Sequence, residues 1–306
     1  MDWFEAMLRG DFESAWRISD GVLRARAGTT SRHLPRHEQW VWDGTPLDGK
    51  RVLIRCYHGL GDTIQFLRYA PLVRERASEV IVWAQPQLVP LLRTIRGIDR
   101  IEPLHDGAFR GEYDVDVESM ELPFVLRTTI ETVPREVPYI DVEPLALVCA
   151  EGDRRPNVGI VWRAGEWDER RWVPFGALAP ILDSGVRLYS LQRDADEPGL
   201  IQLEEANDVV GTARAMKAMD LVISADTMTA HLAGAVGVPV WTLLPATCDW
   251  RWMRDRETTP WYPTMRLFRQ ERPGEWAPVI SRVAAELARI AVTSSFPRVL
   301  PVLGGK

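Results

Sequence analysis

Two short apolar strands, each followed by a loop and the start of a helix, constrain this 306-residue chain more than any other feature. The first unit reads Arg51-Val-Leu-Ile-Arg-Cys-Tyr-His-Gly-Leu-Gly-Asp62. The second reads Leu221-Val-Ile-Ser-Ala-Asp-Thr-Met-Thr-Ala-His231. A helix that starts behind a strand leaves unpaired backbone N–H groups pointing outward, so each unit is suited to bind an anion. Two such units predict two stacked α/β domains with a cleft between them.

Composition is compatible with two domains of ordinary size. Hydrophobic residues make up 46% and charged residues 26% of the chain, as in a typical globular protein. The formal net charge of −6 argues against a nucleic-acid partner, which would require a basic surface.

The location expected from the sequence is the cytoplasm. Cys56, Cys149 and Cys248 are too few and too widely spaced for a disulfide framework or a zinc knuckle, so we interpret them as small core or loop residues. No apolar run approaches the length of a membrane span, and the first residues lack the layout of a signal peptide. Peripheral association with a membrane stays open.

The chain divides into three predicted parts. Residues 1–49 form a helical hairpin, 3–27, and a linker, and the polar, Pro-bearing break at 151–157 separates a first domain, 50–150, from a second, 151–306. Alternating strands and helices in both domains predict parallel sheets flanked by helices. The predicted elements are strands at 52–56, 79–83, 100–103, 113–117, 158–162, 186–191, 221–224 and 238–244, and helices at 62–77, 86–95, 227–236 and 277–291, the last of which packs back.

Asp62 is the candidate for chemistry in the first domain. Gly59 and Gly61 let the backbone turn tightly and approach a ligand, and Asp62 stands at the predicted N-cap of the next helix. One interpretation is that Asp62 only caps this helix. The other is a general base, because carboxylates at the carboxyl end of a parallel strand face the ligand crevice.

Asp226, Thr227 and His231 are the candidates in the second domain. The Thr227 hydroxyl and the exposed N–H groups are suited to a diphosphate, which the helix dipole also favours. His231 follows one turn later, either as a donor to a phosphate or leaving oxygen or as a buried structural histidine. Gln192 lies after another strand, where it borders a nucleotide or forms a surface turn.

Several motifs occur in the order found in one enzyme family. They are Gly59-Leu-Gly-Asp-Thr-Ile-Gln-Phe-Leu-Arg-Tyr69, Val158-Gly-Ile-Val-Trp162, Ser190-Leu-Gln192, Asp226-Thr with His231-Leu-Ala-Gly-Ala-Val-Gly-Val-Pro-Val-Trp241, Asp249-Trp-Arg-Trp252 and Trp261-Tyr-Pro263. Over roughly residues 50–290 the chain resembles bacterial glycosyltransferases related to heptosyltransferases, especially those fused behind tetratricopeptide repeats.

The resemblance implies the GT-B fold: two Rossmann-like domains, the N-terminal one for the acceptor and the C-terminal one for the nucleotide sugar. It matches Asp62 to the catalytic carboxylate and Asp226, Thr227 and His231 to the donor motif. If Asp62 is only a helix cap, His58 becomes the next candidate for the base. It also implies a basic residue that assists the phosphates, for which Arg163, Arg170 and Arg171 are candidates. Arginine suits this task because its planar fork binds phosphate oxygens and keeps its charge.

Two positions depart from the family pattern. Related chains commonly have Trp-Ala-Gly after the strand, whereas this chain has Trp162-Arg-Ala-Gly165, so that Arg163 is inserted next to the predicted donor residue Trp162. Met228 stands where a small residue is common. These departures motivate one alternative, a catalytically silent nucleotide-sugar-binding module. A nucleotide-sugar epimerase of the same fold is the other.

The predicted function is a metal-independent inverting glycosyltransferase, hexosyl- or heptosyltransferase-like. The donor is a nucleoside-diphosphate sugar, the acceptor is a hydroxyl of a saccharide, a lipid-linked saccharide or a protein, and no cofactor is implied. The sequence has no His/Cys cluster with metal-ligand spacing. Four tryptophans are expected in the core rather than stacked on a sugar: Trp250, Trp252, Trp261 and Trp276.

Overall fold

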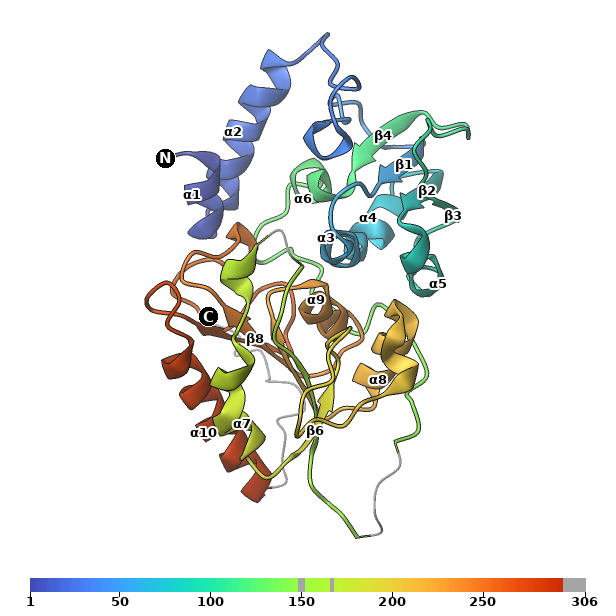
Figure 1. Ribbon diagram of the computed structural model, residues 1–306. Helices are drawn as coiled ribbons and strands as arrows, with labels where there is room; N and C mark the ends of the chain where they lie inside the picture. The colour runs from blue at the N-terminus through green and yellow to red at the C-terminus, as the bar shows by residue number, and fades with distance from the viewer. Residues whose placement is uncertain (148–151, 166–167, 294–306) are drawn as a thin grey trace. The chain divides into compact units, whose positions relative to one another are not determined.

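The computed structural model describes residues 1–147, 152–165 and 168–293. Contacts divide the chain into two compact units (Figure 1). Unit 1 comprises Met1–Arg135, Tyr139–Asp141 and Trp250–Arg254, and unit 2 comprises the remainder. The predicted hairpin and linker, 1–49, are part of unit 1. The segment Trp250–Arg254 also belongs to unit 1, although its neighbours in the sequence belong to unit 2.

A four-stranded parallel sheet forms the centre of unit 1. Its strands are β1 (Arg51–Arg55), β2 (Glu79–Ala84), β3 (Arg100–Pro103) and β4 (Val115–Glu118), in the order β3-β2-β1-β4. Val52 pairs with Val80 on one side and Val115 on the other, and all three are buried. Apolar runs of this kind are typical of parallel strands because helices cover both faces of the sheet.

The connection from β1 to β2 is less regular than the single helix predicted over 62–77. It consists of α3 (Leu60–Phe66), a 3₁₀ turn η2 (Leu67–Tyr69) and α4 (Ala70–Arg74). Pro71 lies in the first turn of α4. Proline lacks the N–H that a continuous helix needs, so the helix is interrupted before it. Shorter elements complete this part of the unit: η3 (Pro86–Leu88), α5 (Val89–Leu92), η4 (Ser119–Glu121) and α6 (Leu122–Val125).

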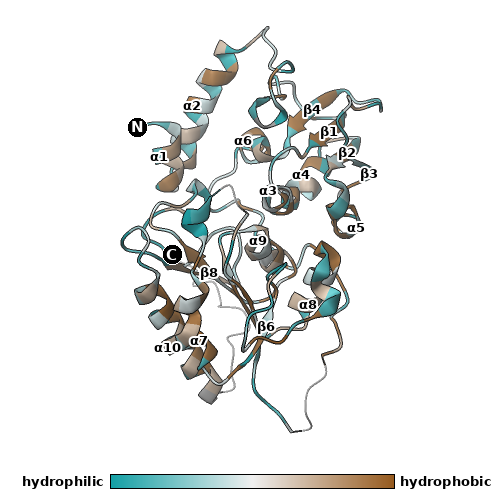
Figure 2. Cartoon of the chain, in the orientation of Figure 1, coloured by the Kyte–Doolittle hydropathy of each residue, from teal (hydrophilic) through white to brown (hydrophobic). Residues whose placement is uncertain are grey.

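The predicted N-terminal hairpin is confirmed as α1 (Trp3–Leu8) and α2 (Phe12–Ala25). The side chains of Asp2 and Asp11 cap the two helices. Brown and teal residues alternate along α2 in Figure 2, as expected for a helix with one buried face. That face packs against the rest of unit 1. There, the indole N–H of Trp16 donates to the carbonyl of Thr128 at 2.6 Å. A 3₁₀ turn, η1 (Arg36–Glu38), lies in the linker.

Unit 2 contains a five-stranded parallel sheet. Its strands are β5 (Asn157–Val161), β6 (Arg187–Ser190), β7 (Leu221–Ala225), β8 (Val240–Leu244) and β9 (Met265–Arg269), in the order β6-β5-β7-β8-β9. The first four were predicted with small shifts at their ends. The sequence did not predict β9, which contains two arginines and three apolar residues.

Helices flank this second sheet. The final helix α10 (Trp276–Thr293) lies beside α7 (Ala179–Leu182), and both contribute to the large apolar cluster of unit 2 (Figure 1). Helix α9 (Met228–Ala235) contacts β7, β8 and α8 (Val209–Lys217). Four 3₁₀ turns complete the described elements: η5 (Glu169–Arg171), η6 (Phe175–Leu178), η7 (Glu204–Asn207) and, in unit 1, η8 (Trp250–Trp252).

Candidate functional site

Asp62 lies in the first turn of α3, at the carboxyl end of β1. Its Oδ2 accepts the N–H of Gly59 at 2.9 Å. The N-cap of the helix is therefore Gly59, and Asp62 is the third helical residue, so the prediction that Asp62 is the N-cap was wrong. The physical reason is that the extended backbone of Gly59 starts the helix earlier, and the carboxylate then reaches back to the cap, as in a capping box.

Arg251 occupies the other oxygen of Asp62. Its Nη1 is 2.7 Å from Asp62 Oδ1 and also donates to Gln65 Oε1 at 2.9 Å. The exposed fraction of the side chain is 8% for Arg251 and 19% for Asp62. A partly buried ion pair of this kind strongly disfavours removal of one partner, because the other charge would remain in a poorly solvated place.

The segment that carries Arg251 is held by the N-terminal helix α1. Arg254 forms an ion pair with Glu5 at 2.9 Å, and its backbone N–H donates to the carbonyl of Leu8. The ring of Trp250 meets the ring of Trp3 edge to face, with centroids 5.4 Å apart. The hairpin thus helps to place the arginine that contacts Asp62.

Gln85 fixes the loop between β1 and α3. Its Nε2 donates to the carbonyl of His58 at 2.7 Å, and its Oε1 accepts the hydroxyl of Thr63 at 2.9 Å. Gln85 directly follows β2, the strand next to β1, so its two hydrogen bonds join the neighbouring strand end to both sides of the segment that contains Gly59 and Gly61. The sequence did not single out Gln85.

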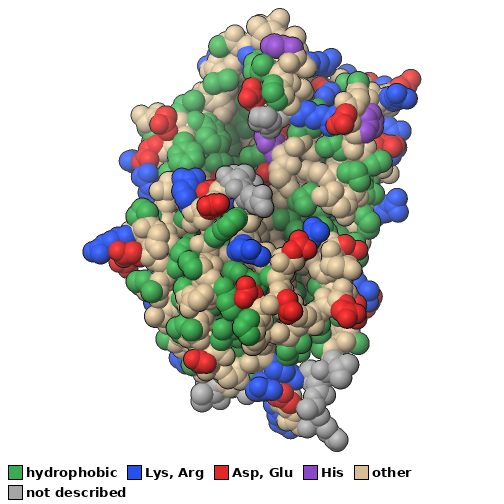
Figure 3. Space-filling view, viewed as in Figure 1, with side chains coloured by type: hydrophobic (Ala, Val, Ile, Leu, Met, Phe, Trp, Pro, Cys, Tyr) green, Lys and Arg blue, Asp and Glu red, His purple; other side chains and the backbone are tan. Residues whose placement is uncertain are grey.

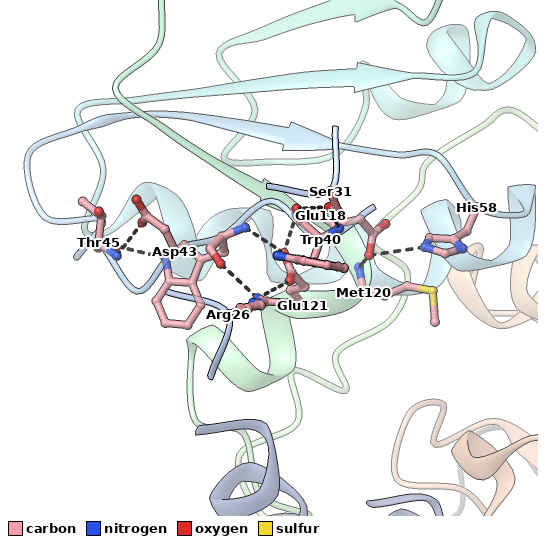
Figure 4. Close-up of polar contacts among 10 residues, drawn as sticks. Arg26, Ser31, Trp40, Asp43, Thr45, His58, Glu118, Met120 and Glu121 are labelled. Atoms are coloured by element: carbon pink, nitrogen blue, oxygen red, sulfur yellow. Dashed lines mark hydrogen bonds and ion pairs between the residues drawn. The ribbon is translucent and has the colours of Figure 1, made fainter. Parts of the chain in front are cut away.

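Glu118 is a second carboxylate that the sequence analysis missed. It ends β4, is 3% exposed, and lies 3.7 Å from His58 Nε2 (Figure 4). Its oxygens accept the hydroxyl of Ser119 and the N–H of Met120. Burial, together with the negative charges of Glu121 and Asp62, raises the pKa of Glu118 to about 8. The only signal in the sequence was a glutamate at the end of a predicted strand. Its proximity to His58 depends on the pairing of β4 with β1, which the sequence does not show.

Glu121 connects this site to the linker. Its carboxylate accepts from Arg26 at 3.2 Å and from the backbone N–H groups of Trp42 and Glu118 (Figure 4). The guanidinium of Arg26 also donates to the carbonyl of Trp42. The end of α2 and the linker are therefore tied to the strand end that carries Glu118.

In unit 2, the predicted donor motif lies where β7 ends and α9 begins. Thr227 is the N-cap of α9, and its hydroxyl accepts the N–H of Thr229 at 3.0 Å. The hydroxyl of Thr229 contacts those of Thr227 and Ser224, and Asp226 is 6% exposed. The start of α9 is thus ordered by short hydroxyl side chains, as the sequence suggested.

Of the predicted arginines, Arg171 reaches this helix start. Its Nη1 donates to the carbonyl of Asp226 at 2.7 Å, and its Nε lies 3.7 Å from a carboxylate oxygen of Asp168. Arg170 points differently: its side chain is 71% exposed and binds Asp168 at 2.7 Å. The structure therefore brings together Arg171, Asp226 and Thr227 but leaves Arg170 on the surface.

Arg163 and Gln192 meet at the ends of β5 and β6. The backbone N–H of Arg163 donates to Gln192 Oε1 at 2.9 Å. The Arg163 Nε is buried and has no hydrogen-bond partner among the described residues. Trp162, by contrast, is 2% exposed and packs against Phe175, so its side chain lies in the core.

His231 lies inside unit 2, and Met228 is partly exposed at the first helical position of α9. His231 is 4% exposed, and its Nδ1 is 3.1 Å from the hydroxyl of Tyr262. This is the environment of a structural histidine, and a contact of His231 with the donor stays a prediction. Gly234 lets Tyr262 approach α9, because a Cβ at this position would lie 2.3 Å from the tyrosine ring.

The remaining sequence predictions concern burial, charge and metals. The four tryptophans expected in the core are buried, which confirms that interpretation. Cys56 is buried and Cys248 partly buried, while Cys149 lies outside the described residues. On the face drawn in Figure 3, acidic and basic side chains are interspersed.

The described part of the chain contains neither a metal-binding cluster nor a helix that could span a membrane. No cluster of three or more His, Cys, Asp or Glu side chains in residues 1–147, 152–165 and 168–293 is arranged to hold a metal ion. Over the same ranges, every helix is too short or too polar to cross a membrane.

Comparison with known proteins gives one curated relative of note. Protein FlbA of Caulobacter vibrioides is 28% identical over 294 residues, covering 82% of this chain and 48% of FlbA. The chain thus spans about half the length of this relative. No family model matches the chain.

Solved structures show a consistent likeness. A glycosyl transferase family 9 protein from Veillonella parvula has a TM-score of 0.53 at 13% identity, covering 82% of this chain and 99% of its own. The iron-containing dodecameric glycosyltransferase TibC from enterotoxigenic E. coli has a TM-score of 0.57 at 13% identity, covering 82% of each chain. The E. coli ADP-heptose heptosyltransferase II has a TM-score of 0.50 at 14% identity, covering 80% of this chain and 99% of its own.

The chain has the fold of the heptosyltransferase-related glycosyltransferases. The predicted α/β class and GT-B architecture, with one parallel sheet in each of two Rossmann-like parts and a helical hairpin at the N-terminus, are confirmed. At these sequence identities the likeness establishes the fold, and function has to be argued from the site.

Proposed function

We propose that this chain is an inverting glycosyltransferase that moves a sugar from a nucleoside-diphosphate sugar to a hydroxyl acceptor. The observation that carries the proposal is the placement of Asp62 at the carboxyl end of β1 and of Thr227 and Arg171 at the carboxyl end of β7. Ligands of parallel α/β sheets bind at this end of the strands. The glycosyltransferase fold of the neighbours supports the same function.

The donor half of the proposal rests on the start of α9. Its first N–H groups and the Thr227 hydroxyl favour a diphosphate, and Arg171 brings a permanent positive charge next to them. The buried Arg163 Nε, which has no partner among the described residues, is a further donor that a ligand would satisfy. These groups stabilise the charge that develops on the leaving nucleoside diphosphate.

The acceptor half rests on Asp62. The acceptor hydroxyl attacks the anomeric carbon, its proton passes to Asp62, and the electron pair of the broken glycosidic bond leaves with the diphosphate. His58 is the second candidate for the base, at the end of the same strand. The sugar is a hexose or heptose, and the acceptor is a saccharide, a lipid-linked saccharide or a protein.

A thermal-shift panel with ADP-, UDP-, GDP- and dTDP-linked sugars tests the donor half. A ligand that binds only the folded chain at 100 times its Kd adds about 2.7 kcal/mol to the free energy of unfolding, so one member should raise the Tm clearly. The stabilising sugar is then incubated with candidate acceptors, and transfer is followed by mass spectrometry.

Each result of this panel has a distinct meaning. Transfer to an acceptor supports the proposal. Binding without any turnover identifies a silent nucleotide-sugar-binding module, and conversion of the donor without an acceptor identifies an epimerase. A Tm that no nucleotide sugar changes would contradict the donor site at α9.

Metal independence is part of the proposal and has its own test. The first turn of α9 and the nearby arginines supply positive charge that many transferases obtain from a divalent ion, so transfer should survive EDTA at the parent rate. Loss of transfer on chelation, with recovery after a divalent ion is added back, would overturn this part. The cytoplasmic location expected from the sequence likewise stays a prediction.

A further inference from the structure

Three carboxylates in unit 1 each have one cationic or basic partner. Asp62 pairs with Arg251 at 2.7 Å, Glu121 with Arg26 at 3.2 Å, and Glu118 with His58 at 3.7 Å. Arginine keeps its charge at every accessible pH, whereas histidine changes its charge near neutrality. Of these three pairs, Glu118 and His58 form the one whose net charge varies near neutral pH.

The sheet topology brings Glu118 and His58 together. Glu118 ends β4 and pairs in register with Arg55 of the neighbouring parallel strand β1, and His58 follows shortly after β1 ends. The Glu118 side chain is 3% exposed and the His58 side chain 26% exposed. The imidazole is therefore accessible while the carboxylate lies behind it, which is the arrangement of an orienting partner.

The groups around Glu118 favour retention of a proton. Asp62 and Glu121 face it from α3 and η4, and Cys56 faces it from the position that follows β1. The cations Arg251 and Arg26 are engaged with Asp62 and Glu121. The raised pKa of Glu118 results first from burial and then from the charge of Glu121. Its two hydrogen bonds from Ser119 and Met120 fix the orientation of the carboxyl group.

We propose that Glu118 is a positioning residue that acts through His58, orienting the imidazole at the end of β1 by the charge and position of its carboxyl group. The role of the pair in transfer rests on the proposed function, because its charge would then act on the acceptor hydroxyl and on Asp62. The pairing itself does not rest on that function, and it can be measured in the chain without substrate.

The first test is NMR titration of the histidine ring signals, which are few because the chain has 5 histidines. His58→Gln assigns the signal of His58. In Glu118→Gln the His58 midpoint should move to lower pH, because Glu118 stabilises the imidazolium once its carboxyl group has lost its proton, and the amide removes this coupling. Glu131→Gln, which removes an exposed carboxylate elsewhere in unit 1, should leave the midpoint unchanged.

If Glu118→Gln does not fold, the pairing can be tested by titrating Glu118 instead of His58. His58→Gln changes a partly exposed side chain, and the ¹³C carboxyl signal of Glu118 is followed in this variant and in the parent. Its midpoint should differ between the two proteins. Equal midpoints for His58 with and without Glu118, or for Glu118 with and without His58, would overturn the pairing.

The second test is a double-mutant cycle on the pH profile of kcat/KM, once a donor and an acceptor are known. Glu118→Gln should change the profile of the parent but not that of His58→Gln, because both act as one unit. Glu118→Asp, which retains a titratable carboxyl group, should restore part of the parent profile. An equal effect of Glu118→Gln in both backgrounds would show a merely structural role. If the NMR shift is found while Asp62→Asn transfers sugar at the parent rate, the pairing stands and the proposed role of Asp62 fails.

Discussion

Asp62 combines three tasks in one side chain. It closes the start of α3 through the N–H of Gly59, it neutralises Arg251, and it is the candidate base. The sequence analysis weighed only capping against catalysis. Because the ion pair with Arg251 is also present, a substitution at Asp62 has a structural cost that capping alone would not predict.

Asp62→Asn should therefore lower both transfer and stability. The amide keeps an acceptor for Gly59 but removes the base, so single-turnover transfer should fall about 10²–10⁴-fold. Arg251 loses its carboxylate partner, so the free energy of unfolding should decrease by about 1–3 kcal/mol. Urea unfolding and circular dichroism measure the second effect, and the folded fraction corrects the first.

A matched variant separates the two effects of Asp62→Asn. Asp114→Asn also removes a carboxylate from an arginine, Arg51, at the amino end of β4 and β1, and it should transfer sugar at the parent rate. If Asp62→Asn also transfers at the parent rate after correction for folding, Asp62 is a structural residue and His58 becomes the candidate base.

The donor site predicts unequal effects of neighbouring arginines. Arg171→Ala removes the side chain that reaches the carbonyl of Asp226, and it should weaken nucleoside-diphosphate affinity roughly tenfold or more. Arg170→Ala should have the smaller effect because that side chain is on the surface. Thr227→Leu, which fills the start of α9, should weaken binding as well. Affinity is measured by calorimetry on variants whose fold is intact. If Arg171→Ala and Thr227→Leu both bind the nucleoside diphosphate as tightly as the parent does, the diphosphate binds elsewhere.

At the scale of elements, the sequence predicted what depends on local pattern. The apolar runs of β1, β2, β5 and β7 have the composition of strands buried on both faces, and each was found near its predicted range. The two arginines among the five residues of β9 gave a weaker signal. The helix expected over 62–77 was interrupted because Pro71 removes a backbone donor.

The candidate site was predicted only where its residues are close in sequence. Asp62 and Thr227 follow strands and were found by that rule, whereas Arg171 was a candidate through the family resemblance. Arg251 and Glu118 reach Asp62 and His58 through the insertion of Trp250–Arg254 into unit 1 and through the pairing of β4 with β1. Neither relation is encoded in a local motif, so the sequence alone did not reveal these two residues.

Contact between α9 and Tyr262 gives a prediction at the element scale. Gly234→Ala would ordinarily stabilise a helix, but here the added Cβ would lie 2.3 Å from the Tyr262 ring. Overpacking of this kind should lower the free energy of unfolding by about 1–3 kcal/mol. Gly176→Ala is the control, because its added Cβ meets nothing within 4 Å. Equal Tm values for the two variants would mean that Tyr262 moves aside without cost.

At the scale of the whole molecule, the hairpin and linker are built into unit 1 rather than appended to it. Arg26 and Trp42 bind Glu121, and Glu5 of α1 binds Arg254 in the segment that carries Arg251. Charged contacts therefore extend from the N-terminal helices to the candidate acceptor site. A change of charge at one of these residues should therefore change the free energy of unfolding of the chain.

Glu118 makes that stability depend on pH in a definite direction. Burial first, and then the charge of Glu121, raises its pKa to about 8 in the folded chain, whereas an unfolded glutamate titrates near 4.3. Between these two values the folded state holds a proton that the unfolded state has released, so the free energy of unfolding decreases as the pH rises. Carboxylates with a lowered pKa, such as Asp11 and Asp168, have the opposite effect, and only at acid pH.

Urea unfolding at several pH values between 5 and 8 should reveal the contribution of Glu118. The parent should lose about 2–4 kcal/mol of stability across this range through this group, and the loss should be much smaller in Glu118→Gln, which has no proton to release. The comparison uses the slope against pH rather than the absolute stability, because the amide replaces one of the two oxygens that accept hydrogen bonds from Ser119 and Met120. Parallel slopes for the two proteins would mean that Glu118 is already ionised in the folded chain at pH 5.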